Sequence, residues 1–188
     1  MNNIPDLPSS ATIIPYRKSF LPSGSDLNAI AVALYEQSLL LASWGLPVFP
    51  LKFGAKTPAL KNFSSRASCC PDAIRNMWFP PMENSPAPFN IGIATGNGLF
   101  VVDIDDKNGK QGSVSWAALE RQHGASPPTF TVRTPSGGRH LYFRADQGIW
   151  IPNSAGKLGV GIDIRGEGGY VVGPGSVLDG RQYVRELN

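Results

Sequence analysis

The sequence has few of the residues that build disulfide frameworks and zinc sites. Its only cysteines are the adjacent Cys69 and Cys70, and its only histidines are His123 and His140. Adjacent cysteines rarely bridge, and no further pair exists to build a framework, so we expect reduced thiols. Two cysteines and two distant histidines match no zinc-ligand spacing. The composition therefore argues against a disulfide scaffold and against a structural zinc.

Long hydrophobic runs are also missing. No apolar run approaches the ~20 residues of a membrane span, and the first residues lack the basic and apolar segments of a secretory signal. We therefore expect no membrane contact and a cytoplasmic location. Charged residues make up only 16% of the chain and hydrophobic residues 41%, as in a globular protein. The net charge of +3 permits a polyanionic partner without requiring one.

Glycine and proline, by contrast, are abundant, with 21 and 17 copies among 188 residues. This favours short strands and ordered turns over a helical bundle. Residues 1–25 are rich in Pro, Ser and Asn without periodicity, so we expect a disordered or loosely packed leader there. The length suits one catalytic or binding domain over residues 26–188.

Periodicity and turn signals predict helices and strands in mixed order. Helices are expected at 26–44, 71–79 and 113–122. Strands are expected at 47–51, 90–96, 99–105, 129–134, 139–144, 160–165, 170–174 and 182–185. Residues Gly96-Asn97-Gly98 predict a hairpin turn between the third and second of these strands. The apolar side chains expected to face the core are Val114, Ala117, Ala118 and Leu119 of the last helix, and Phe130, Val132, Val160, Ile162 and Ile164 of the later strands.

An apolar strand that runs into acidic residues stands near the middle of the chain, at 99–106. Because side chains alternate along a strand, Asp103 and Asp105 are expected to share one face, about 7 Å apart at the backbone. Carboxylates at that spacing can converge on one divalent ion or on a closely spaced pair. Hard oxygen ligands suit Mg²⁺ or Mn²⁺ bound with substrate phosphates. An Asp-x-Asp at a strand end is also a common solvated turn.

Two further strands repeat the design of an apolar face and a polar face. One presents His140, Tyr142 and Arg144, and the other presents Asp163 and Arg165. If the three strands lie in one sheet, Asp163 supplies a third carboxylate to the same surface. Such a site meets the needs of nucleotidyl transfer, in which one ion activates a primer 3′-hydroxyl and the other holds the triphosphate.

Phosphate groups also need cationic or N–H donors. The turn before the His140 strand offers a compact candidate cradle, because glycines let a backbone approach anions closely. This cradle consists of Ser136, Gly137, Gly138, Arg139 and His140. Standing alone, His140 is better explained as a hydrogen-bonded structural imidazole, and the lysine-bearing loop around Lys56 as ordinary surface.

Three motifs in this order resemble those of the bifunctional primase–polymerase domain of the archaeo-eukaryotic primase superfamily. They are Val101-Val102-Asp103-Ile104-Asp105, then the run 134–143 with Ser136 and His140, then the run 161–172 with Asp163 and Arg165. Supporting runs lie at 50–58, 74–78 and 90–96. The resemblance extends from about the first helix to near residue 185.

The resemblance implies an α+β fold, with an RNA-recognition-motif-like catalytic sheet beside a second small α/β lobe and the active site in the cleft between them. It implies a DNA-directed nucleotidyltransferase that extends or starts strands in plasmid, phage or prophage replication. By analogy Asp103, Asp105 and Asp163 bind two Mg²⁺ or Mn²⁺ ions, and Ser136 and His140 contact the triphosphate.

The implied partners are a single-stranded DNA template, a primer strand and NTP or dNTP. The weaker carry-overs, as phosphate or template contacts, are Arg139, Arg165 and Lys56. In such replication proteins a helical module and often a helicase follow the catalytic domain, and we expect both to be absent from this chain.

Two other functions are compatible with parts of the sequence. A nucleotide-sugar transferase also uses Asp-x-Asp to hold a metal diphosphate, but that chemistry leaves the Ser136–His140 turn and Asp163 unexplained. A non-catalytic module that binds single-stranded nucleic acid would keep the same acids for structural reasons. Its DNA binding would survive chelation and fall with salt.

Overall fold

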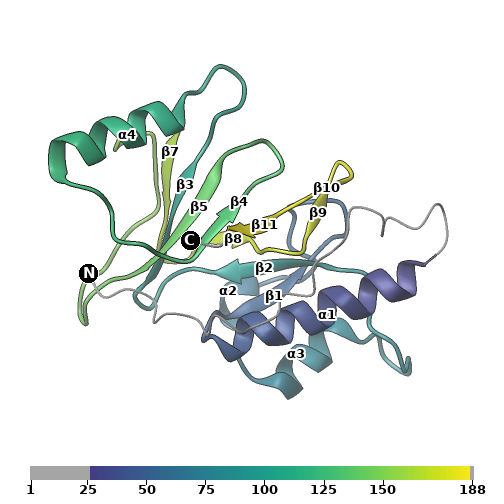
Figure 1. Ribbon diagram of the computed structural model, residues 1–188. Coiled ribbons are helices and arrows are strands. Elements are labelled where there is room, and N and C mark those ends of the chain that lie inside the picture. Colours follow the sequence, from purple (N-terminus) through teal and green to yellow (C-terminus); the bar gives the residue numbers. More distant parts are fainter. Residues whose placement is uncertain (1–25, 187–188) are drawn as a thin grey trace. The chain divides into compact units, whose positions relative to one another are not determined.

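The computed structural model describes residues 26–186 (Figure 1). The leader expected at 1–25 lies outside this range. The described residues form two compact units. One contains 95–171 and 183–186, and the other contains 26–94 and 172–182. Within the described range, helices occur only in the first two thirds of the chain and the sheets given by register are antiparallel, so the fold is of the α+β class, as the sequence predicts.

The first unit is built on a six-stranded sheet with the order β11-β4-β5-β3-β7-β6. All of its pairings given by register are antiparallel. Its strands are β3 (Leu99–Ile104), β4 (Thr131–Arg133), β5 (Arg139–Arg144), β6 (Ser154–Ala155), β7 (Ile162–Arg165) and β11 (Val184–Glu186). The helix α4 (Gly112–His123) lies against one face of this sheet (Figure 1).

The core of this unit forms where α4 covers the sheet. Alternate residues of the three central strands point to this face and are buried: Phe100, Val102, Ile104, Leu141, Phe143, Ile162 and Ile164. Trp116 and Leu119 of α4 pack against them. Period-two alternation thus separates an apolar face from the face that carries the acids.

The second unit packs helices on a smaller sheet with the order β1-β2-β8. Its elements are α1 (Leu27–Ser43), β1 (Val48–Leu51), α2 (Phe63–Arg66), α3 (Pro71–Trp78), β2 (Asn90–Ala94) and the hairpin of β9 (Val177–Leu178) and β10 (Arg181–Gln182). The strand β8 (Tyr170–Val172) spans the boundary between the units. Asp26 caps α1 by accepting a hydrogen bond from the Ala29 amide. β1 is an edge strand of this sheet, a position that tolerates Pro50 within the strand.

Several expectations about strand pairing and facing are wrong. The turn at 96–98 does close, through two hydrogen bonds between Gly96 and Leu99, but β2 and β3 belong to different sheets and are not a hairpin. The strand expected at 182–185 is divided between β10 and β11, which also lie in different sheets. Local turn chemistry predicts the reversal of the chain but not the partner of each strand.

Facing errors have a single cause, which is that apolar side chains also occur outside the core. Val160 is 68% exposed and Val114 59% exposed, and Ala117 and Ala118 are exposed too. Of the apolar side predicted for α4, only Leu119 packs on the sheet, together with Trp116. Val132 is fully buried, as expected, although its register opposite His140 puts it on the sheet face that carries the acids.

No helix among residues 26–186 combines the length and the apolar composition that a membrane crossing needs. Within the same residues Cys69 and Cys70 form no disulfide.

The buried side chain of Asn90, on β2, hydrogen-bonds to the backbone of two other segments of the second unit. Its buried amide donates to the carbonyls of Ala55 (3.1 Å) and Val177 (2.7 Å) and accepts from the Val177 amide (3.0 Å). Replacement by alanine leaves buried backbone groups without partners, at a cost of about 1–3 kcal/mol for each such group.

We therefore expect Asn90→Ala to lower the free energy of unfolding by about 3 kcal/mol in urea titrations. Asn76→Ala, on the exposed side of α3, is the matched control and is expected to change it by less than about 0.5 kcal/mol. Equal effects of the two substitutions would contradict this role of Asn90.

Candidate functional site

The central strand β3 brings three sequence-predicted residues together. In the register Asp103 lies opposite His140 of β5 on one side and opposite Asp163 of β7 on the other. Directly opposed residues of antiparallel strands project to the same face, so all three point away from α4. Asp103 and Asp163 each have 14% of the side chain exposed, and His140 Nε2 lies 3.5 Å from Asp103 Oδ1.

A guanidinium joins the two carboxylates. Arg165 Nη2 lies 3.3 Å from Asp103 Oδ2 and 3.1 Å from Asp163 Oδ2. Asp163 is also held through its other oxygen, since Oδ1 accepts a hydrogen bond from the Gly156 amide (3.0 Å). Arg165 is two residues from Asp163 on β7 and therefore shares its face.

Asp105 follows the end of β3, and its backbone is fixed on both sides. Its amide donates to the Gly161 carbonyl (2.8 Å), and its carbonyl accepts from the Gly112 amide (3.0 Å). Its carboxylate is paired with Lys107 Nζ at 3.4 Å and Lys110 Nζ at 3.6 Å. Both glycines are required, because a Cβ at either would lie within 3 Å of backbone atoms.

Asp106, the next residue, is also held by hydrogen bonds, although the sequence pattern did not single it out. Its carboxylate accepts hydrogen bonds from the Ser113 amide (2.9 Å) and the Ser113 hydroxyl, at the first turn of α4. These bonds, the hydroxyl bond first, lower the pKa of Asp106 below its ordinary value of 3.8. No capping pattern in the sequence marks Asp106, because the residue at the N-cap position of α4 is Gln111.

The predicted phosphate cradle is an ordered turn between β4 and β5. Thr134 and Gly138 are joined by a backbone hydrogen bond of 2.8 Å, and the Thr134 and Ser136 hydroxyls lie 3.1 Å apart. Gly138 packs on the end of β3, where a Cβ would lie 2.1 Å from the Ile104 carbonyl oxygen. The exposed Ser136 and Gly137 therefore lie at the end of the sheet where Asp105 lies.

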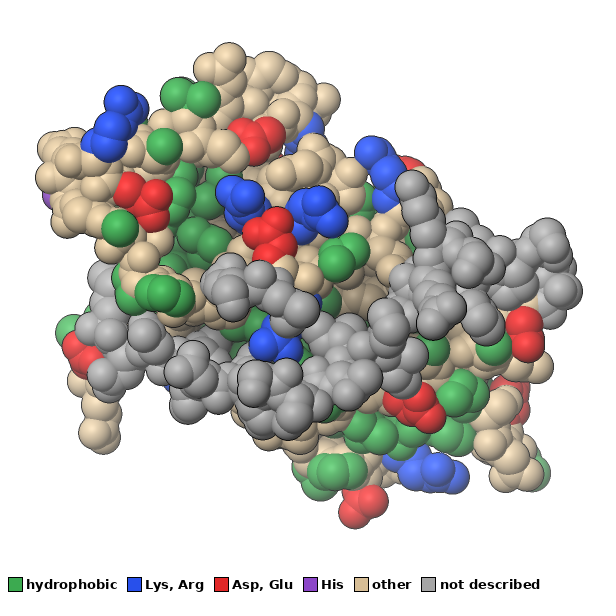
Figure 2. All heavy atoms as spheres, viewed as in Figure 1, with side chains coloured by type: hydrophobic (Ala, Val, Ile, Leu, Met, Phe, Trp, Pro, Cys, Tyr) green, Lys and Arg blue, Asp and Glu red, His purple; other side chains and the backbone are tan. Residues whose placement is uncertain are grey.

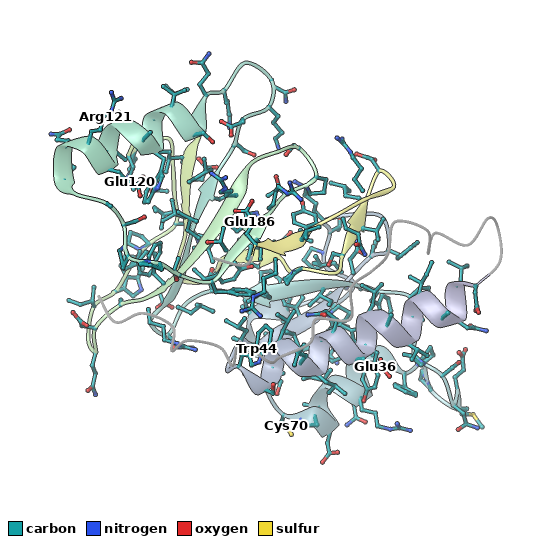
Figure 3. All side chains as sticks on the ribbon, in the orientation of Figure 1. Glu36, Trp44, Cys70, Glu120, Arg121 and Glu186 are labelled. Carbon is teal, nitrogen blue, oxygen red and sulfur yellow. The ribbon has the colours of Figure 1, made fainter. Side chains whose placement is uncertain are left out.

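Two further basic residues, Arg139 and Lys56, were predicted to contact phosphate or template. Arg139 is opposite Ile104 in the register and so projects to the α4 face. There its Nε donates to Glu186 Oε2 at 2.9 Å, and Glu186 is labelled in Figure 3. Arg139 is therefore not on the sheet face that carries the acids. Lys56 lies in the second unit, in the loop after β1.

Aromatic rings surround His140. Tyr183 lies 5.7 Å and Tyr142 6.5 Å from the imidazole, between ring centroids. Phe130 contacts Tyr142 edge-on at 4.9 Å. Tyr142 is fully buried, and burial followed by the charge of Asp103 raises its pKa, so its hydroxyl stays protonated. Tyr183 and Phe130 were not expected at the site, because neither belongs to a polar strand face.

The donor set fits a hard divalent cation, though no cluster of ligands is already gathered. Among residues 26–186, no group of three His, Cys, Asp or Glu side chains is placed to hold a metal ion as it stands. The carboxylates of Asp103 and Asp163 do share a cation, the guanidinium of Arg165. Oxygen ligands of this kind suit Mg²⁺ and Mn²⁺ better than softer metals. On the face drawn in Figure 2, acidic and basic side chains are interspersed.

Paired carboxylates, an imidazole and a glycine turn on one sheet are groups that bind cations and phosphates. Comparison with protein families assigns residues 38–187 to the bifunctional DNA primase/polymerase, N-terminal family. The match covers most of the chain, and the chain belongs to this family. A comparison with curated proteins finds no significant match. Membership indicates DNA primase and polymerase function of the nucleotidyltransferase class, which generally depends on divalent metals.

Substitution of Gly161 tests whether close packing of Gly161 and Gly112 around Asp105 stabilises the fold. Gly161 has φ +80°, and an added Cβ would lie 2.7 Å from the Asp105 carbonyl oxygen and 2.8 Å from the Gly112 nitrogen. Gly161→Ala is expected to destabilise the fold by about 2–4 kcal/mol in urea unfolding. Gly109→Ala, at φ +77° with nothing within 4 Å, isolates the backbone strain and is expected to cost about 1 kcal/mol. If the two variants lose the same free energy of unfolding, close packing against Asp105 does not explain why a glycine occupies position 161.

The hydrogen bonds that the Asp106 carboxylate accepts from Ser113 predict a pH-dependent stability. Because its folded pKa lies below the unfolded value of about 3.9, the ionised carboxylate stabilises the folded state above that pH. The contribution is lost as the pH falls through the folded pKa. Wild type is therefore expected to be more stable than Asp106→Asn at pH 7 and pH 5, with the difference shrinking below about pH 4. Urea titrations across this range measure it, and a pH-independent difference would contradict the assignment.

Proposed function

We propose that the acid-bearing face of the six-stranded sheet is the catalytic surface of a metal-dependent DNA primase/polymerase. The supporting observation is the register of β3, which sets Asp103 between Asp163 and His140 on one face. In this proposal the sheet is the RNA-recognition-motif-like sheet of the family. It acts on a primer and a single-stranded template in plasmid- or phage-type replication.

The proposed ligands of two Mg²⁺ or Mn²⁺ ions are Asp103, Asp105 and Asp163. When bound, such ions would lower the pKa of a primer 3′-hydroxyl and neutralise charge on the leaving pyrophosphate. The fixed backbone of Asp105 and the Gly156 amide on Asp163 limit the movement of two of the three carboxylates.

The chain itself supplies the proposed contacts to the triphosphate. His140 presents Nε2 to the acid face, 3.5 Å from Asp103, and a protonated imidazole can donate to a phosphate oxygen. The exposed Ser136 hydroxyl lies at the end of the same sheet and can donate to a further phosphate oxygen. The Gly137 amide already donates to the Thr134 carbonyl (3.0 Å), so it contributes only if this turn opens. Arg139 contributes only if it leaves Glu186.

Incorporation of labelled nucleotides on a primed single-stranded template, with Mg²⁺ or Mn²⁺, tests the proposal. Asp103→Asn and Asp163→Asn keep the side-chain shape but remove a charge that the ions need, and each is expected to reduce kcat/KM by about a hundredfold or more. Asp72→Asn, in the first turn of α3, is the control and should retain wild-type activity. Full activity of either site variant would overturn the site.

A second candidate function rests on the salt bridges. Arg165, Lys107 and Lys110 already neutralise the three carboxylates, as structural acids in a non-catalytic module for single-stranded nucleic acid would be neutralised. That function requires DNA binding that resists chelation, weakens with salt and persists in Asp105→Ala, without nucleotide incorporation. Nucleotide-sugar transfer receives no such support, and it requires metal-dependent hydrolysis of a sugar nucleotide with indifference to DNA.

A further inference from the structure

Arg165 contacts the oxygens that a divalent ion would need. One nitrogen, Nη2, lies 3.3 Å from Asp103 Oδ2 and 3.1 Å from Asp163 Oδ2. The two strands hold these carboxylates in register, so the guanidinium lies between them and offsets their repulsion. Two carboxylates on one face would otherwise disfavour each other's charge.

The remaining oxygens of this pair have other neighbours. Asp163 Oδ1 accepts the Gly156 amide at 3.0 Å, and Asp103 Oδ1 faces His140 Nε2 at 3.5 Å. The two Oδ2 atoms are therefore the ones that share a neighbour, which is Arg165 Nη2. A cation bridging them competes directly with the guanidinium.

We propose that Arg165 is a positioning residue that holds Asp103 and Asp163 together, yields their Oδ2 atoms to a divalent cation, and then binds the triphosphate that accompanies the cation. This inference rests on the proposed function and adds a sequence of contacts to it. Arg165 lowers the affinity for the metal ion, because the ion must displace it from the two Oδ2 atoms. It supports nucleotide affinity, because the displaced guanidinium faces an incoming anion.

The chemistry of the side chain suits both contacts. A guanidinium is always charged and carries five donors in a planar fork that matches carboxylate and phosphate oxygens. Its contacts with the acids use Nη2 alone, and the side chain is 38% exposed. A short rotation about the outer torsions moves it from the carboxylates towards solvent without moving β7.

Opposite effects on two affinities distinguish this role from a structural one. With Mn²⁺ alone, followed by electron paramagnetic resonance of the free ion, Arg165→Gln is expected to bind about three- to tenfold more tightly than wild type. With Mn²⁺ saturating, the same variant is expected to bind a non-hydrolysable nucleoside triphosphate about tenfold more weakly.

Two control variants accompany the titration. Arg133→Gln removes the same charge from an exposed position on β4 and is expected to leave Mn²⁺ affinity within about twofold of wild type. Asp163→Asn is expected to abolish tight Mn²⁺ binding. Thermal melting of each variant confirms that it is folded before it is titrated.

The outcomes separate the two proposals. If wild type binds no Mn²⁺, or Asp163→Asn binds it as wild type does, the proposed metal site fails and this inference fails with it. If Asp163→Asn loses Mn²⁺ but Arg165→Gln binds it no more tightly, only the inference is overturned. It is also overturned if Arg133→Gln tightens Mn²⁺ equally, or if Arg165→Gln leaves nucleotide affinity unchanged.

Discussion

The site depends on the pairing of β3 with both of its neighbours. β3 is short and central, and its register with β5 and β7 sets Asp103 between His140 and Asp163. A slip of one residue in either pairing would turn the polar set of that strand into the α4 core and bring its apolar set out. Burial of Phe100, Val102 and Ile104 against the core therefore also specifies the position of the carboxylates.

Contacts of three glycines fix the backbone just beyond the end of β3. Asp105 follows β3 and has no strand partner, so its position depends on the Gly161 carbonyl and the Gly112 amide. The Gly138 turn approaches from the other neighbour, against the carbonyl of Ile104. Three backbone segments thus meet at one corner, where only glycine leaves enough room. The loops on either side can carry functional groups because this corner is rigid.

Alternation of side chains made much of this predictable, and its failures are informative. The polar faces of β3, β5 and β7 were read from the sequence because each strand is apolar on its other side. The partners of each strand could not be predicted in this way. A turn such as Gly96–Gly98 fixes only local geometry, and long-range packing determines which sheet a strand joins. Val132 is buried as expected, but alternation does not tell which of the two sheet faces an apolar residue of a short strand occupies.

Salt bridges could not be foreseen from spacing alone. Arg165 was expected as a phosphate contact, and its bridge between two carboxylates was not foreseen, nor was the pairing of Arg139 with Glu186 across 47 positions of sequence. Such pairs depend on which side chains the sheet brings to one face. The carboxylates that define the site are consequently surrounded by cations of the same chain. If this face binds a metal ion as proposed, the ion would replace cations that already contact Asp103, Asp105 and Asp163, so the measured affinity would be a difference between two sets of charges rather than the strength of one.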